Sequence, residues 1–159
     1  MTEDLPRIPI PSPDSDRTDK MVFLQEQLVN FLGQYSMPLI EASLVFSKYT
    51  RQLVEALTSE ANTQGETLPE ILAQPWPILG DSEAIDTSSP RLETLLENLD
   101  DDRMDILDTI LRSSITATEM PLADALMQLR QWEHLTRNQL ADSKGAGQLF
   151  SPIEIPEDW

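Results

Sequence analysis

The chain has 159 residues and a formal net charge of −17 at neutral pH, from 28 acidic and 11 basic side chains. A charge of that size repels phosphate backbones and anionic lipid, so we expect neither direct nucleic-acid binding nor membrane attachment. The absence of cysteine excludes disulfides, thiolate metal sites and cysteine nucleophiles. No apolar run has the length of a membrane helix and the first residues lack a signal-peptide core, so we expect a cytoplasmic protein.

Twelve prolines fall mainly in the first thirteen residues, in the middle and at the end. Helical periodicity lies between them, which predicts an all-α fold: an irregular helical bundle or a coiled-coil dimer with disordered, proline-rich termini. We expect five segments along the chain. These are a Pro/Ile arm (1–18), a helical or coiled-coil segment (19–61), a loop containing proline and tryptophan (62–89), a second helical segment (90–141) and a flexible acidic tail ending in tryptophan (142–159).

The arm alternates isoleucine with proline in the stretch RIPIPSP. Proline fixes φ and removes backbone donors, so this stretch should be extended and polyproline-like. Arg7 is the only basic residue among the first sixteen. We interpret the arm as a disordered segment that carries a partner-binding motif formed by Arg7, Ile8 and Ile10.

A first helical stretch follows the arm, and Thr18 or Asp19 can cap its start. Gly33 and Pro38 then break the periodicity and predict a kink or a short turn. The apolar residues before this break recur at the steps of one helix face. They are Met21, Phe23, Leu24, Leu28, Phe31 and Leu32.

From Leu39 the apolar pattern becomes nearly three heptads, the spacing that a helix needs to lie along another helix. A coiled-coil dimer and an antiparallel hairpin fit this spacing equally well, and we expect self-association. The expected helix-packing or oligomerisation residues are Leu39, Phe46, Tyr49 and Leu53, and the pattern also includes Ala42 and Ala56.

The loop over 62–89 contains Pro69, Pro75, Trp76 and Pro77, which prevent regular structure, yet it also carries several apolar residues. We interpret it as a loop draped over the helices, with Trp76 holding it in place. A second exposed partner motif is the alternative.

A third helix should begin near Ser89-Pro90, a side-chain cap followed by proline at the first helical position. The last helix should start at Thr118, with Pro121 inside its first turn, and run to about Ala141. The two glycines of SKGAGQ then end it.

The sequence shows no arrangement of residues at which we can place a chemical reaction. His134 is the one histidine, and without cysteine it cannot form a conventional zinc site unless carboxylates join it. Asp101, Asp105 and Asp108 share one helix face and could bind a hard cation, but the calcium-loop pattern is absent, so we interpret them as a solvated acidic face. No nucleophile elbow or phosphate-binding glycine loop is present. We therefore expect a non-enzymatic protein without a cofactor.

The sequence finishes on SPIEIPEDW, which repeats the isoleucine–proline rhythm of the arm. Apolar side chains on a stiff backbone lose little entropy on docking, and tryptophan is strongly enriched at interface hot spots. We expect Ile153, Ile155 and Trp159 to bind a partner pocket, with the neighbouring acids selecting a basic rim. The alternative is a tail that folds back, so that Trp159 packs on its own domain.

This outline resembles the maintenance of carboxysome distribution protein B family: an arm over 1–18, heptads from Leu39 to Leu57, and PEDW with Trp159 last. The resemblance implies a self-associating adaptor that links carboxysome cargo to a ParA-type ATPase and can form condensates. It also implies that Trp159 contacts the cargo and Arg7 the ATPase. The chain departs from the family in its acidity and in the helical pattern after Ser89.

We therefore expect a non-enzymatic adaptor that uses its two terminal motifs to bind different protein partners, with a ParA-type ATPase and the carboxysome shell as the specific prediction. One alternative is an acidic regulatory protein that masks a basic surface of a transcription or nucleic-acid-processing protein. Another is an assembly chaperone for a basic client.

Overall fold

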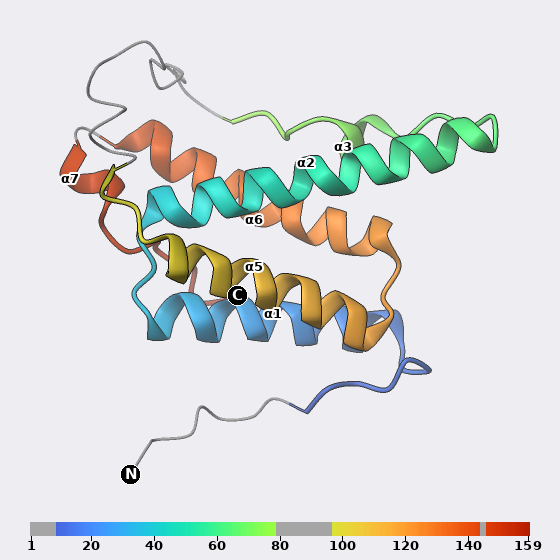
Figure 1. Ribbon diagram of the computed structural model, residues 1–159, viewed down its shortest axis with the longest axis horizontal. Coiled ribbons are helices and arrows are strands. Elements are labelled where there is room, and N and C mark those ends of the chain that lie inside the picture. The colour runs from blue at the N-terminus through green and yellow to red at the C-terminus, as the bar shows by residue number, and fades with distance from the viewer. Residues whose placement is uncertain (1–8, 79–96, 144–145) are drawn as a thin grey trace.

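A computed structural model describes residues 9–78, 97–143 and 146–159, and within these ranges the chain is mostly helical (Figure 1). The predicted all-α fold is confirmed for this part of the chain, where the one β-type pairing is an isolated bridge between Pro38 and Pro152. The helices are α1 (Arg17–Gln34), α2 (Leu39–Thr63), α3 (Glu70–Ala73), α5 (Asp101–Thr118), α6 (Leu122–Asp142) and α7 (Ala146–Leu149).

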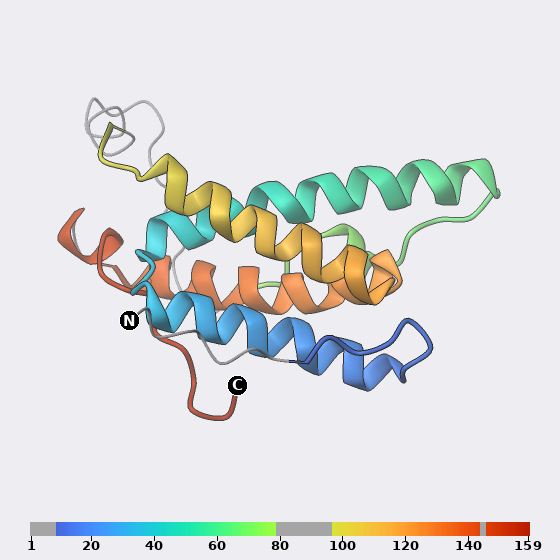
Figure 2. The same cartoon turned by 60° about the horizontal axis from the view of Figure 1, so that its bottom comes forward.

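The four long helices α1, α2, α5 and α6 form a bundle in which the two most extensive contacts join helices that are not consecutive in the sequence. Helix α2 lies along α6, and α1 lies along α5. Both pairs are antiparallel (Figure 1), and the turned view in Figure 2 shows α5 inclined to α2. The bundle therefore depends on contacts between the first and second halves of the chain.

The heptad residues of α2 are part of the core of this bundle. Leu39, Phe46, Tyr49 and Leu53 are all buried, whereas Ala56 is exposed. In the structure α2 lies along α6 and α5 of the same chain, and because other helices separate α2 from α6 in the sequence, this pair is not the antiparallel hairpin that we gave as one alternative. Self-association through this stripe would require the bundle to open.

Two helix boundaries differ from the prediction. Helix α1 begins after Asp16, two to three residues earlier than the expected caps. Helix α5 ends at Thr118, where we expected the last helix to start. The reason is that Glu119 adopts the left-handed conformation, with φ of 51°, and Pro121 then precedes the first turn of α6. The expected helix start at Ser89-Pro90 lies outside the described residues.

A polar break comes before α5. The Asp100 carboxylate accepts a hydrogen bond from the Arg103 backbone N–H at 3.1 Å, which satisfies one of the free donors of the first turn. This cap starts a new helix at Asp101. None of the helices in the described ranges combines the length and the apolar composition needed to cross a membrane.

Candidate functional site: the carboxyl-terminal segment and its groove

The carboxyl-terminal segment, Ser151–Trp159, lies across the connection between α1 and α2. The Leu39 backbone N–H donates to the Ser151 carbonyl at 2.8 Å, and the Ile153 N–H donates to the Met37 carbonyl at 2.9 Å. Together these bonds form one rung of an antiparallel ladder around Pro38 and Pro152. Proline has no N–H, and Pro38 and Pro152 fit here because both hydrogen bonds of this pairing are donated by other residues.

Gln139 of α6 holds the next residue of the segment from the other side. Its amide nitrogen donates to the Glu154 carbonyl at 2.6 Å, and its amide oxygen accepts from the Glu154 N–H at 3.0 Å. One side chain thus satisfies both backbone groups of Glu154. We call the surface formed by Met37, Leu39 and Gln139 the tail groove.

The segment alternates sides as an extended chain does. Ile153 is 6% exposed and belongs to the core, and Ile155 is partly buried against it. Glu154, between them, is exposed. The apolar side chains therefore face the bundle and the acids face solvent.

Trp159 rests on a chain of aromatic side chains. Its ring meets Trp132 edge to face, with ring centroids 4.7 Å apart, and Trp132 contacts Phe46 at 5.6 Å. Trp132 is fully buried, and its indole N–H donates to the Gln25 side-chain oxygen at 2.7 Å. Trp159 itself stays partly exposed beside a hollow lined by Val22, Gln25, Glu26 and Gln131.

The structure therefore has the tail folded onto its own domain, the alternative to the free tail that we favoured. The physical reason is that Ile153 and Ile155 find apolar cover while Glu154 and the segment's backbone find hydrogen-bond partners. Partner binding by Ile153, Ile155 and Trp159 stays a prediction.

The amino-terminal arm shows a different arrangement. Ile10 is 60% exposed. The Lys20 ammonium group donates to the Pro13 carbonyl at 2.6 Å, which holds the end of the arm beside the first turns of α1. Arg7 and Ile8 lie outside the described residues.

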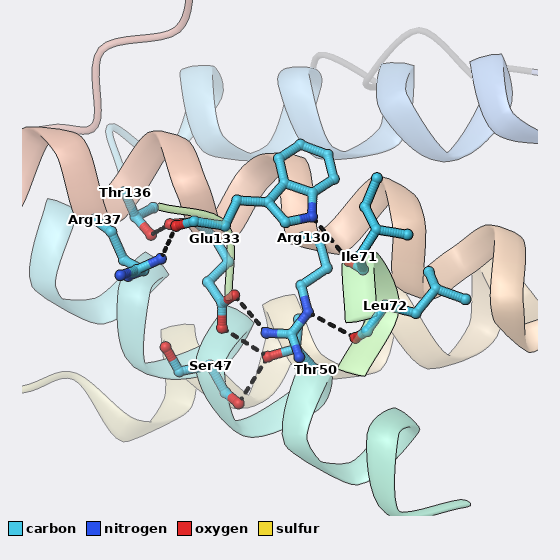
Figure 3. Close-up of polar contacts among 9 residues, drawn as sticks. Ser47, Thr50, Ile71, Leu72, Arg130, Glu133, Thr136 and Arg137 are labelled. Carbon is cyan, nitrogen blue, oxygen red and sulfur yellow. Dashed lines mark hydrogen bonds and ion pairs between the residues drawn. The ribbon is translucent and has the colours of Figure 1, made fainter. Parts of the chain in front are cut away.

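Side chains of α6 also hold the segment that contains Trp76 (Figure 3). The guanidinium Nε of Arg130 donates to the Leu72 carbonyl at 3.0 Å, and Arg137 donates to the Trp76 carbonyl. His134 is half-buried, with its Nε2 3.1 Å from the Pro77 carbonyl oxygen and its ring in contact with Trp76. Arg130, His134 and Arg137 of α6 thus contact three backbone carbonyls of the segment 72–77.

Arg130 also forms a buried ion pair with Glu133 of the same helix. Arg130 and Glu133 are 4% and 5% exposed, and Arg130 Nη1 lies 2.7 Å from Glu133 Oε1. The other Glu133 oxygen accepts from the Thr50 hydroxyl at 3.0 Å, joining α6 to α2 (Figure 3). Arg130 and Glu133 therefore each have an oppositely charged partner, without which burying either charge would be costly.

The acidic face of α5 lies along α2. Asp101, Asp105 and Asp108 line one hollow together with Lys48 of α2, as their spacing predicts for a common face. Asp108 forms an ion pair with Arg112. Across the described residues, no three His, Asp or Glu side chains are grouped so that they could hold a metal ion.

The sequence does not single out the polar residues that organise these sites, which are Gln139, Gln25, Arg130 and Glu133, nor Glu41, whose buried carboxylate pairs with Arg103 of α5. A signal for two of them exists, because Glu41 and Glu133 each stand beside core positions, between Ile40 and Ala42 and next to Trp132. Nothing in the sequence identifies Gln139 as a backbone-binding residue.

No family model matches the chain, and no solved structure matches it.

Proposed function

We propose that the protein is a non-enzymatic adaptor that acts in the cytoplasm and binds a partner protein through its carboxyl-terminal segment. The observation that carries the proposal is the way Ser151–Trp159 is held: a short extended peptide on the surface, attached by backbone hydrogen bonds and a few side chains. This is the form in which proteins recognise linear motifs by strand addition.

Release of the segment breaks its hydrogen bonds and uncovers Ile153, but it leaves the contacts among the four long helices in place. Each of its hydrogen bonds contributes only about 0.5–1.5 kcal/mol net, because water replaces the partners. A partner that offers a sheet edge can replace the hydrogen bonds of the segment's backbone. A deep pocket in that partner can bury Trp159 more completely than its present contact with Trp132 does. The exposed acids Glu154, Glu157 and Asp158 then favour a basic rim around that pocket.

The resemblance in the sequence suggests specific partners. It makes the cargo, a carboxysome shell component, the partner of Trp159, and a ParA-type ATPase the partner of Arg7. Self-association and condensate formation belong to the same proposal.

The test compares the full-length protein with Trp159→Ala and Trp76→Ala as tagged baits in native lysate, followed by binding measurements with the purified partner. We expect Trp159→Ala to lose one set of partners and at least tenfold in affinity for the purified partner. Trp76→Ala is the matched control, because it removes the same side chain from another surface. Equal capture by all three baits, with circular dichroism showing equal helicity, would refute the proposal.

A second candidate function rests on the acidic face of α5, where Asp101, Asp105 and Asp108 line one hollow. A protein that masks a basic surface should bind through this face, with strong salt dependence. It should lose binding when Asp101 and Asp105 are changed to asparagine and should tolerate Trp159→Ala. The two candidates therefore give opposite results with the same pair of variants.

A further inference from the structure

We propose that the tail groove also binds the amino-terminal arm of a second copy of this chain, so that release of the carboxyl-terminal segment joins copies together. The inference deepens the proposed function and rests on it in one respect: a partner that takes Ser151–Trp159 leaves the groove open. It is built on the groove's contacts and on a sequence pattern that the two ends share.

The groove holds the pattern Ile-x-Ile-Pro. In the carboxyl-terminal segment this is Ile153-Glu154-Ile155-Pro156, with both isoleucines directed at the bundle. The arm carries the same pattern as Ile8-Pro9-Ile10-Pro11. In an extended chain Ile8 and Ile10 lie on one side, as Ile153 and Ile155 do.

The backbone chemistry of the arm matches most of the groove. Ile8, like Ile153, has an N–H that can donate to the Met37 carbonyl. Pro9 has no N–H and cannot reproduce the bond from Glu154 to the Gln139 amide oxygen. The arm is therefore the weaker ligand, and it takes the groove only after the tethered carboxyl-terminal segment has left.

The arm of the same chain could approach the groove only if it extended almost fully along α1. Met37, which accepts the hydrogen bond from Ile153, belongs to the connection between α1 and α2, and Figure 1 shows this connection at the opposite end of α1 from its start. Pro13 is held at Lys20, and from Lys20 to Gln34 the helix rises about 21 Å at ~1.5 Å per residue. Ile8 is five residues before Pro13, at most about 18 Å of extended chain. A second copy supplies the arm without this limit.

The test uses purified full-length chains with no partner present, so its outcome is independent of the test of the proposed function. Ile153→Asp places a charge at a buried apolar position, so it should release the carboxyl-terminal segment from the groove. Ile153→Leu keeps the apolar contact and is the control. Ile155→Asp is a second variant, which places the charge at a partly buried position of the same stripe and leaves the core residue Ile153 unchanged. Sedimentation velocity over a concentration series measures the mass, and circular dichroism checks the fold.

We expect Ile153→Asp and Ile155→Asp to sediment at twice the 18.0 kDa of one chain or more, while Ile153→Leu stays monomeric. Adding Ile8→Asp and Ile10→Asp to either variant should restore the monomer, and so should an excess of the free peptide SPIEIPEDW. Three results would overturn the inference: released variants that stay monomeric, association that persists without Ile8 and Ile10, or association that the peptide does not reverse.

Discussion

Tyr49 shows how a single buried side chain responds to its surroundings. It is 7% exposed in the core between α2 and its neighbours. Burial, and then the nearby charge of Asp108, raise the pKa of the Tyr49 hydroxyl above its ordinary value of 10.0, and Arg112 lowers it in part. Both dominant effects disfavour the phenolate, so the folded protein holds the proton more tightly than the unfolded chain.

This shift predicts a loss of stability at alkaline pH. Because the pKa in the folded state is the higher one, the stabilisation is fully present below about pH 10. It is lost as the pH rises from there through the pKa of the folded state. Tyr49→Phe removes the titrating group and should flatten this part of the stability curve, which urea titrations at a series of pH values from neutral to alkaline will measure. Tyr35→Phe, at an exposed tyrosine, is the control; an unchanged slope in Tyr49→Phe would contradict the assignment.

At the scale of elements, an ion pair joins the start of α5 to the start of α2. Glu41 is fully buried, and both of its oxygens accept from Arg103, each at 2.7 Å. This bidentate contact raises the pKa of Arg103 further above its ordinary value. The pair joins the first turns of two helices that are 62 residues apart in the chain.

Breaking this pair should be costly. Arg103→Ala leaves the buried Glu41 carboxylate without its cation, and we expect a loss of about 3 kcal/mol in the free energy of unfolding. Arg51→Ala, at an exposed arginine of α2, is the matched control and should change stability by less than about 0.5 kcal/mol. Chemical denaturation measures both. A similar loss in both variants would show that the pair has no special role.

The elements also show how far the sequence predicts this structure. Apolar periodicity predicts the long helices and the buried positions Phe46 and Tyr49, because periodicity reports which face is dry. It does not predict which helices meet, because that choice depends on contacts such as Glu41 with Arg103. The heptads of α2 fit an intermolecular or an intramolecular neighbour equally well.

The sequence predicts the apolar residues of the carboxyl-terminal segment and does not predict the surface on which they lie. The sequence identifies Ile153, Ile155 and Trp159 as an apolar stripe on a proline-stiffened segment, since those properties are local. The groove is assembled from Met37, Leu39 and Gln139, which the chain brings together only in three dimensions. A pattern in neighbouring residues cannot predict a binding surface that is assembled from distant parts of the chain.

At the scale of the whole molecule, the net charge of −17 opposes the compact state. Salt screens this repulsion, with a Debye length that falls from about 30 Å at 0.01 M to about 10 Å at 0.1 M. We therefore expect the melting temperature to rise with NaCl concentration over this range, as measured by circular dichroism. Sucrose at matched osmolality is the control for effects that do not involve charge. A melting temperature that falls with salt would show that ion pairs such as Arg103–Glu41 outweigh the overall repulsion.

The pairing of α2 with α6 has a consequence during protein synthesis. Helix α2 ends at Thr63, and α6 begins at Leu122. At about 5–20 residues per second, roughly 3–12 s pass between the synthesis of these two points. During that interval the nascent chain presents the apolar face of α2 without its main neighbour. Ribosome-associated chaperones that hold exposed apolar helices should therefore engage this chain between the emergence of Leu53 and that of Trp132.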